Sequence, residues 1–386
     1  MGTDRASNAS GLSASGRTLM RIGWNALYLR RGVINGTSVY AEQLIKAILT
    51  LDSDNIYYLY LNRDLADFPA PDVPNLRRVI CPISPNNRVL RYAYEQTVLP
   101  FLARRHRLDL LHSLNTIAPL LLPCPSVVTL HDTRFVVLSE DMSALRRRIV
   151  IFFTASGSRR AKRVIAVSEF AKREMSAHLR LSAQKIDVVH SGAGTTTPIC
   201  YGAEAAAIRA QHGVQQPYIA AIGGGYPHKN IPRLLDAFRQ IQADFPHDLV
   251  LIGKVPPNVS PEQLTERVRI TGYVPHAHLP TLLNGAALFV LPSLYEGFGL
   301  PVLEAQAADV PLVCSRAAAL PEIAGKGAYY FDPNDTADLV AALRTCLSDS
   351  ALRETLRMEG RANLQRFSWA SAARKTLEVY QCAAQR

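Results

Sequence analysis

Cysteines are few in this sequence, and they are spread along the whole chain. The 386 residues include six, and none lies in a Cys-x-x-Cys pair. Zinc ribbons and disulfide frameworks both require cysteines at short, regular spacings. The spacing argues against both classes, suits a reducing cytoplasm, and favours small buried hydrophobic roles. The six are Cys81, Cys124, Cys200, Cys314, Cys346 and Cys382.

Long hydrophobic runs are also missing. No apolar run approaches the roughly 20 residues that a membrane-spanning helix needs. Residues 1–18 are rich in Ser, Ala and Gly and lack the apolar segment of a signal peptide. We predict that residues 1–18 form a disordered N-terminal tail and that the protein is cytoplasmic.

Metal-ligand spacings are absent as well. No group of His, Cys and Asp residues in the sequence has the spacing of a metal site. Asp52-Ser-Asp54 spells a D-x-D sequence, but it connects a predicted helix to a predicted strand, where turn residues belong. We therefore predict that activity requires no bound metal.

The net charge of +11 is concentrated in one half of the chain. Residues 1–200 contain 26 Lys and Arg against 15 Asp and Glu, whereas residues 201–386 contain 17 of each kind. The excess lies in clusters such as Arg104–Arg107 and Arg159–Arg163. This asymmetry indicates that the N-terminal half meets an anionic partner, although a solvated helix face explains any single cluster equally well.

Strand-like apolar runs alternate with amphipathic stretches along the whole chain, which predicts an α/β protein with parallel sheets. The alternation breaks in a turn-rich segment at residues 191–198. The length exceeds that of an ordinary single domain, so we expect two doubly wound, Rossmann-like domains facing each other across a cleft, with ligands at the carboxyl ends of the strands. The predicted parts are an N-terminal domain (19–190), a linker region (191–217), a C-terminal domain (218–368) and a final helical segment (369–386).

Two glutamates flank a predicted helix start in the C-terminal half. The strand Leu288–Leu291 is followed by Glu296-Gly-Phe-Gly-Leu-Pro-Val-Leu-Glu304. Pro301 fits only the first turn of a helix, so the helix begins near residue 299 or 300 and its free N–H groups form an anion site. Taken alone, a Glu in a first turn also fits simple complementation of the helix dipole. The combined spacing after a buried strand favours a ligand site whose carboxylates suit sugar hydroxyls.

A second candidate element is the glycine turn Gly223-Gly-Gly225, which leads to Lys229. It leaves a predicted strand and enters a predicted helix, so Lys229 stands at the helix start as a movable positive charge suited to a diphosphate. The segment is neither a P-loop nor a dinucleotide fingerprint, because the spacing that those motifs require is missing. A solvated surface lysine is the alternative interpretation.

Together these segments resemble the family 4 retaining glycosyltransferases of GT-B fold. The stretch Pro292–Ala305 is similar to their E-x7-E signature, and Lys229-Asn230, Thr271-Gly-Tyr273 and Leu320-Pro-Glu322 occur in the family's order. The resemblance covers nearly the whole chain from residue 20. It implies that the C-terminal domain binds the nucleotide-sugar donor and that the N-terminal domain holds most of the acceptor. It also implies that the last helix, residues 370–384, crosses back onto the first domain.

The resemblance further implies roles for individual residues. Glu304 is expected to bind the donor ribose and Glu296 the transferred sugar, while Lys229 neutralises the leaving diphosphate. Two positions depart from the family: Gly223 stands where many relatives have Arg, and Asp309 stands where Gly is usual. The other donor-binding candidates of this half are Gly223, Gly224, Tyr273, Gly297, Phe298, Gly299 and Leu300.

In the N-terminal half, His131-Asp132 follows the buried strand Ser126–Leu130. A lone His is more often structural than catalytic, but the end of a parallel strand and a matching His-Asp in the family both favour a site. The resemblance implies that His131 contacts the transferred sugar and that Asp132 orients it or the local loop. Gly36-Thr37 resembles the family's glycine loop over the diphosphate, with an ordinary loop and helix cap as the alternative. The catalytic candidates are His131, Glu296 and Lys229.

These expectations combine into one leading function, a retaining glycosyltransferase of cell-surface polysaccharide or glycolipid synthesis that uses neither metal nor cofactor. The resemblance to bacterial mannosyltransferases favours GDP-mannose as donor, with UDP- or dTDP-sugars as alternatives. A glycan or lipid-diphosphate saccharide acceptor, together with peripheral contact to an anionic inner membrane face, would explain the basic half. A sugar-nucleotide epimerase of the same fold is a further alternative. A nucleic-acid-binding protein is disfavoured, because no RNP, helix-turn-helix or finger pattern occurs.

Overall fold

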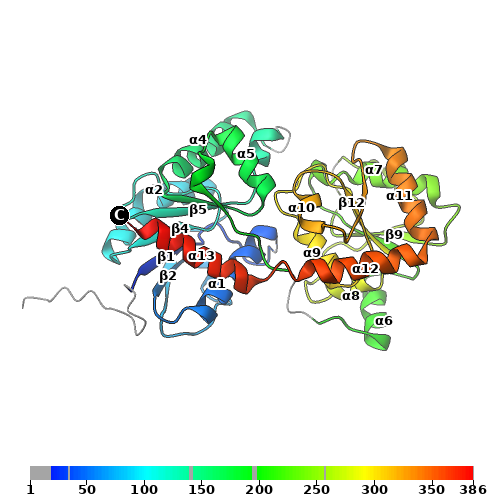
Figure 1. Ribbon diagram of the computed structural model, residues 1–386, viewed down its shortest axis with the longest axis horizontal. Coiled ribbons are helices and arrows are strands. Elements are labelled where there is room, and N and C mark those ends of the chain that lie inside the picture. Colours follow the sequence, from blue (N-terminus) through cyan, green and yellow to red (C-terminus); the bar gives the residue numbers. More distant parts are fainter. Residues whose placement is uncertain (1–18, 34, 139–141, 194–197, 256–257, 386) are drawn as a thin grey trace, which may run out of the picture.

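The computed structural model describes residues 19–33, 35–138, 142–193, 198–255 and 258–385. The tail predicted for residues 1–18 therefore lies outside the described residues. The described chain forms two lobes, each with a parallel sheet covered by helices (Figure 1). We name them the N-terminal lobe, which contains β1–β7, and the C-terminal lobe, which contains β8–β13. This arrangement confirms the predicted fold class of two Rossmann-like α/β domains.

The N-terminal lobe contains seven strands in the order β3-β2-β1-β4-β5-β6-β7, and every pair in the sheet is parallel. Six of them follow the strand order of a dinucleotide-binding sheet. The chain adds strands on one side of β1 and then on the other, so a ligand crevice opens between β1 and β4. The strands are β1 (Arg21–Asn25), β2 (Ile56–Asn62), β3 (Leu76–Cys81), β4 (Leu110–Ser113), β5 (Ser126–Leu130), β6 (Arg163–Ala166) and β7 (Ile186–Val188). The helices are α1 (Gly36–Leu51), α2 (Arg88–Arg105), α3 (Arg134–Val137), α4 (Ala144–Arg160) and α5 (Glu169–Leu179).

The C-terminal lobe repeats this winding with six parallel strands in the order β10-β9-β8-β11-β12-β13, so its crevice lies between β8 and β11. The strands are β8 (Tyr218–Ile222), β9 (Asp248–Ile252), β10 (Val268–Ile270), β11 (Leu288–Leu291), β12 (Leu312–Ser315) and β13 (Tyr329–Phe331). The helices are α7 (Ile231–Ile241), α8 (Leu279–Asn284), α9 (Leu300–Ala307), α10 (Leu320–Ala324), α11 (Thr336–Ser348) and α12 (Ser350–Leu364).

The central strands explain why the sequence shows apolar runs and not alternation. All residues of β5 and of β11 are buried, because helices cover both faces of a parallel sheet and each strand must then be apolar on both sides. The bounds predicted for these two strands are those of the structure. The three-residue edge strand β13 was not predicted, since only Phe331 of it is fully buried and its apolar signal is short.

The last helix, α13 (Trp369–Ala384), lies on the N-terminal lobe, although α12 before it packs on the C-terminal lobe (Figure 1). Its Tyr380 is completely buried. The Tyr380 hydroxyl accepts a hydrogen bond from Trp24 Nε1 at 2.9 Å and lies 2.6 Å from Nδ1 of His112. These buried bonds fix α13 to β1 and β4, so the chain's end ties the two lobes together.

Two details differ from the sequence-based interpretation. The region predicted as a linker, 191–217, contains helix α6 (Gly202–Gln211), which buries Ala205 and Ile208; residues 194–197 lie outside the described residues. Cys382 is exposed, so the interpretation of the cysteines as buried hydrophobic residues is wrong there. Within the described ranges, no helix is both long and apolar enough to cross a membrane.

Candidate functional site

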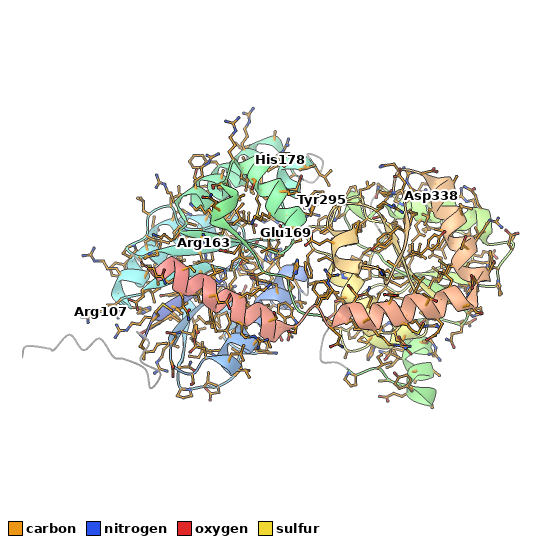
Figure 2. The ribbon with its side chains drawn as sticks, in the orientation of Figure 1. Arg107, Arg163, Glu169, His178, Tyr295 and Asp338 are labelled. Carbon is orange, nitrogen blue, oxygen red and sulfur yellow. The ribbon has the colours of Figure 1, made fainter. Side chains whose placement is uncertain are left out.

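Loops at the carboxyl ends of the strands bring the two lobes into contact. Ser168 Oγ donates a hydrogen bond to the carbonyl of Gly297 at 2.6 Å. Thr133 Oγ1 lies 3.1 Å from the hydroxyl oxygen of Tyr295. Figure 2 shows Tyr295 on the side of the C-terminal lobe that faces Glu169 of the other lobe. The loops that carry the predicted residues of the two lobes thus meet at one edge of each sheet.

Glu322 joins the lobes in a way that the sequence did not reveal. Its carboxylate accepts hydrogen bonds from the backbone N–H groups of Glu169 (2.8 Å) and Phe170 (3.0 Å), at the N-terminus of α5. His190 Nε2 lies 2.9 Å from the same carboxylate. Burial alone would raise the pKa of Glu322, but His190 and these backbone bonds hold it below its usual value. A carboxylate of one lobe therefore completes a helix terminus of the other.

On the C-terminal lobe, the predicted residues Glu296 and Lys229 form an ion pair. Lys229 Nζ lies 2.7 Å from Glu296 Oε1, and Ser293 Oγ donates to the same oxygen at 2.9 Å. Burial alone would raise the pKa of Glu296, but Lys229 and the hydrogen bonds from Lys229 and Ser293 lower it below its usual value. Glu296 is therefore an anion at neutral pH, and its charge is held in place before any ligand arrives.

Helix α9 begins where Pro301 predicted. Gly299 is its N-terminal cap with φ +102° and ψ 52°, a left-handed conformation that glycine adopts without strain. Among the described residues no side chain caps this terminus, so the amides of its first turn have no side-chain partner there. The helix start adjoins the other lobe, since a Cβ atom on Gly36 would lie 3.6 Å from Leu300. Such amides, with the helix dipole behind them, suit a phosphate or a sugar oxygen.

Gly297 is the tightest point between the lobes. A Cβ atom built on it would lie 2.0 Å from the carbonyl oxygen of His131 and 2.8 Å from Cβ of Asp132. No side chain fits at such distances, so this position admits only glycine while the lobes keep this arrangement. The glycine that the sequence suggested for ligand approach thus also lets the donor loop pack against the His131-Asp132 turn.

Glu304 lies one turn inside α9 and is half-buried. Burial raises the pKa of its carboxyl, and the nearby His276 and Lys229 lower it. Among the described residues, no hydrogen bond to its carboxylate is formed, in contrast to Glu296. A carboxylate in this position has both oxygens available for the hydroxyls of a ligand.

The glycine turn before Lys229 is shaped by close backbone contacts. A Cβ atom on Gly223 would lie 2.8 Å from the carbonyl oxygen of Lys254, so a side chain at this position would require the backbone to shift. At Gly224 the corresponding space is open up to Lys229 Cγ at 4.0 Å. Asn230 has φ 56° and donates its side-chain amide to the Pro333 carbonyl at 2.9 Å. This left-handed residue, which suits Asn, turns the chain so that Lys229 points to Glu296.

Asp309, the second departure from the family, has a structural explanation. Its φ of 59° is the left-handed conformation that favours glycine. Its carboxylate forms two hydrogen bonds with Arg361 of α12, at 2.6 and 2.8 Å. The aspartate therefore stabilises the contact between α9 and α12 and takes no part in the candidate site.

Tyr273 is not brought to the other site residues by contacts within the described chain. Its side chain is 67% exposed, and it makes no hydrogen bond or ring contact with a described residue. Its donor-binding role remains a prediction.

On the N-terminal lobe, His131 lies at the end of β5, as predicted. Its Nε2 lies 3.2 Å from the Leu114 carbonyl, and its ring meets that of Tyr40 edge-on at 4.7 Å between centroids. Burial lowers the pKa of His131 to about 4, although the bond to Leu114 raises it. The imidazole is therefore neutral at pH 7. A hydrogen bond to a carbonyl requires a proton on Nε2, which leaves Nδ1 as an acceptor.

The remaining candidates of this lobe lie beside His131. Asp132 Oδ1 accepts a hydrogen bond from the backbone of Arg134 at 3.1 Å, so it orders the local loop. Gly36 is the first residue of α1, and a Cβ atom on it would lie 3.6 Å from Leu300 of the other lobe. Thr37 shares a cavity with His131. The start of α1 therefore faces the start of α9. Asn35 caps α1, which is the ordinary loop-and-cap role that the sequence left open for this segment.

Arg134 is a candidate that sequence reasoning missed. Its Nη1 lies 3.0 Å from Nδ1 of His228, next to Lys229 along the chain, and its guanidinium lies over the ring of Tyr226. This places an N-terminal-lobe cation beside the glycine turn, where Gly223 supplies none. A charged residue four positions after a buried strand is the only sequence signal for it.

The arrangement brings together one ion pair, an open helix N-terminus, an available carboxylate and a neutral imidazole. The first two suit a diphosphate, the third suits a pair of ribose hydroxyls, and the imidazole adds an uncharged polar contact opposite them. The described residues contain no group of three or more His, Cys, Asp or Glu placed to hold a metal ion.

Two family descriptions match the two lobes. Residues 216–349 match "Glycosyl transferases group 1", and residues 34–196 match "Glycosyltransferase Family 4".

Curated relatives include the O-antigen chain mannosyltransferase B of Escherichia coli, 31% identical over 265 residues that cover 66% of this chain and 70% of the relative. The serotype-specific mannosyltransferase WbdA of Escherichia coli is 29% identical over 57% of this chain, but that match spans only 29% of WbdA. Among solved structures, sucrose-phosphate synthase of Thermosynechococcus elongatus superposes with a TM-score of 0.73 at 19% identity, covering 94% of this chain and 98% of the other.

Proposed function

Because this chain belongs to the family 4, or group 1, glycosyltransferases, we propose that it is a retaining hexosyltransferase that takes mannose from GDP-mannose. The acceptor is a hydroxyl of a glycan or lipid-linked saccharide in cell-surface polysaccharide assembly. The nucleotide-sugar is a substrate, and the reaction uses neither cofactor nor metal.

The observation that carries this proposal is the Lys229–Glu296 pair beside the open N-terminus of α9. A diphosphate that binds at the helix terminus takes over Lys229, since a phosphate oxygen competes with the carboxylate for the ammonium. Glu296 is then released toward the hydroxyls of the transferred sugar. The available carboxylate of Glu304 lies one turn further along α9 for the ribose.

The transfer itself can proceed with the groups that the donor brings. The bond between the sugar C1 and the diphosphate oxygen breaks, a bond from the acceptor oxygen to C1 forms on the same face, and the acceptor proton passes to the leaving phosphate. No protein general base is needed, and His131, whose pKa burial lowers to about 4, is a weak proton acceptor. Lys229 and the α9 amides supply the positive charge that a metal supplies in other glycosyltransferases.

Mannose as the transferred sugar is supported by the relatives. The two mannosyltransferases named above cover 66% and 57% of this chain, and their names describe an O-antigen chain enzyme and a serotype-specific enzyme. A UDP- or dTDP-sugar would be accommodated by the same diphosphate contacts, so the donor must be found by experiment.

We also propose that the protein contacts an anionic membrane through its basic N-terminal lobe. Support comes from exposed apolar side chains next to the basic clusters: Phe101 is 63% exposed in the helix that ends in Arg104 and Arg105, and Leu145 is 71% exposed beside Arg146. Flotation with vesicles containing phosphatidylglycerol, but not with neutral vesicles, would support this contact, and equal flotation in both would contradict it.

The decisive experiment is a thermal-shift screen with GDP-mannose, UDP-glucose, UDP-galactose and dTDP-glucose, each with and without EDTA. Ligand at 100 times its Kd adds about 2.7 kcal/mol to the free energy of unfolding, which raises Tm by several degrees. We expect the largest rise with GDP-mannose, unaffected by EDTA. A largest rise with a UDP-sugar would replace the donor, and no rise with any of them would contradict the proposed function. The alternative, an epimerase, would be recognised by conversion of the nucleotide-sugar into its epimer when no acceptor is present.

A further inference from the structure

A continuous chain of hydrogen bonds runs through the core of the N-terminal lobe, from the last helix toward the candidate site. It begins at Tyr380 of α13, whose hydroxyl accepts from Trp24 Nε1 at 2.9 Å and lies 2.6 Å from His112 Nδ1. His112 Nε2 lies 2.8 Å from Oγ1 of Thr129, and that oxygen lies 3.0 Å from the hydroxyl of Tyr40 in α1. Each of the five side chains is 0 or 1% exposed. The chain therefore links α13, the sheet and α1 entirely inside the core.

The neutral state of His112 gives these bonds a direction. Burial lowers the pKa of His112 to about 3, so at pH 7 one nitrogen of its imidazole accepts and the other donates. Because Trp24 can only donate, the hydrogen of the Tyr380 hydroxyl goes to Nδ1 of His112, and Nε2 then donates to Thr129. Each of these polar groups has a partner, and a buried network that is fully satisfied holds its members rigidly.

The chain ends against His131. Tyr40 bonds to Thr129 through its hydroxyl, while its ring meets the imidazole of His131 edge-on, with 4.7 Å between centroids. Edge-to-face contacts hold aromatic rings at a preferred angle. The carbonyl of Leu114, 3.2 Å from Nε2 of His131, determines which nitrogen carries the proton. Tyr40 therefore sets the angle of the imidazole, and the hydrogen-bond chain sets the position of Tyr40.

Tyr40 also contacts the segment that returns from the C-terminal lobe. Helix α13 packs along α1, and its first residue, Trp369, meets Tyr40 with 6.2 Å between ring centroids. Gly192, where the chain leaves the N-terminal lobe, lies against the same residue, since a Cβ atom on it would lie 2.5 Å from Cγ of Trp369. The ring that contacts His131 is thus held between the hydrogen-bond chain and the crossing between the lobes.

We propose that Tyr40 and Tyr380 are positioning residues for His131 in sugar transfer. Tyr380 anchors the hydrogen-bond chain to α13, the chain holds Tyr40, and Tyr40 holds the imidazole toward the donor. This inference rests on the proposed function, since it concerns the same reaction. The competing explanation is a chain that only stabilises the fold, which would change the free energy of unfolding and leave the imidazole where it is.

The test removes single hydroxyl groups and keeps the rings. Tyr40→Phe and Tyr380→Phe are made in the wild-type protein and in His131→Ala. Tyr57→Phe is the matched control, because Tyr57 is also completely buried but its hydroxyl bonds to Asp52 at 2.6 Å, outside the chain. For each protein we would measure Tm, the Kd of GDP-mannose and the kcat for release of GDP from it, with methyl α-mannoside as acceptor.

We expect kcat to fall about five- to tenfold in Tyr40→Phe and in Tyr380→Phe, with the donor Kd within twofold of wild type. Tyr57→Phe should keep kcat within twofold. In the His131→Ala background the same two changes should lower kcat by less than twofold, because the group through which they act is gone. The proposal is overturned if both variants keep kcat within twofold of wild type, or if their losses are equally large in both backgrounds.

A second measurement needs no activity. It also covers poor folding of Tyr380→Phe, since Tyr40→Phe leaves the bonds of Tyr380 intact. In protein labelled with ¹⁵N-histidine, the imidazole nitrogen shifts report which nitrogen is protonated, and His131→Ala identifies the signals of His131. The wild-type protein and Tyr57→Phe should show the proton on Nε2. In Tyr40→Phe the shifts should move toward a mixture of tautomers, and unchanged shifts would overturn the proposal.

Failure of this inference can be distinguished from failure of the proposed function. If the wild-type protein neither binds GDP-mannose nor releases GDP from it, the proposed function fails, and the nitrogen shifts still decide whether the chain orients His131. If the wild-type protein is active and His131→Ala is equally active, the positioning inference is overturned while the proposed function stands.

Discussion

The two lobes contribute opposite kinds of chemistry to the site. On the C-terminal lobe the central groups, Lys229 and Glu296, are charged and already paired, with Lys229 Nζ 2.7 Å from Glu296 Oε1. On the N-terminal lobe the central group, His131, is uncharged at pH 7 because burial lowers its pKa to about 4, and it bonds to the Leu114 carbonyl. The Lys229–Glu296 side therefore binds a ligand by exchanging one ion pair for another. The His131 side binds it through hydrogen bonds from an uncharged group.

This difference separates binding of the donor from orientation of the reacting groups. Exchange of Lys229 from Glu296 to a phosphate is driven by the donor's charge, so donor affinity should depend on the C-terminal lobe. The neutral side gains little from long-range attraction, and its contribution depends on distances that are set where the lobes touch. Changes at the point of contact, on the neutral side and on the charged side should therefore have distinct kinetic effects.

The largest effect is expected where the two sides touch. Gly297→Ala would place a methyl group 2.0 Å from the His131 carbonyl, so the lobes must separate or the loop must move. A displacement of about 1 Å in an active site costs on the order of 100-fold in rate. We expect kcat/KM to fall at least that far, with the far-ultraviolet circular dichroism spectrum unchanged.

The matched control is Gly225→Ala in the other glycine loop, where an added Cβ meets nothing within 4 Å. It should keep activity within about twofold. Small-angle scattering that shows the same compactness for Gly297→Ala and wild type, with full activity, would contradict the assignment of Gly297 as the contact that sets the distance between the two sides.

The next effect isolates the neutral side. His131→Ala removes the imidazole opposite the donor but none of the charges that bind the diphosphate, so kcat should fall roughly 10- to 100-fold while the donor Kd changes little. Steady-state kinetics and donor titration separate the two quantities. Because the pKa of His131 is about 4, its protonation should leave the rate profile flat between pH 6 and 8. A full-rate His131→Ala enzyme would return this residue to a structural role.

The sequence predicted the charged side far better than the neutral one, for a physical reason. Glu296 and Glu304 lie within one stretch whose geometry is local, because Pro301 and Gly299 decide where α9 begins. Lys229 follows its own strand by a short glycine turn. Residues this close along the chain can be placed in space from periodicity and turn chemistry alone.

The neutral side depends on contacts between distant segments. Glu95 and Arg91 of α2 share a cavity with His131 because the order of strands in the sheet brings β1, β4 and β5 together. Glu322 caps a helix of the other lobe, and the tight fit of Gly297 depends on the carbonyl of His131. No spacing in the sequence reports such distances. The resemblance to a family placed His131 at the site, but it named neither Glu95 nor Arg134.

The smallest of the three effects belongs to the charged side and tests whether its two carboxylates differ. Glu304→Ala removes the carboxylate without a described partner, whereas Glu296 is paired with Lys229. If Glu304 binds the ribose through a charge-assisted hydrogen bond, its loss costs about 1.5 kcal/mol, which raises the donor Kd about tenfold. The kcat at saturating donor should change less than threefold, since the ribose is remote from the reacting bond.

Isothermal titration with the free nucleoside diphosphate, which lacks the sugar, should show the same tenfold loss of affinity for Glu304→Ala and none for Glu296→Gln. Equal losses in both variants would mean that the two carboxylates act on one group, and the separation of ribose and sugar roles would have to be abandoned.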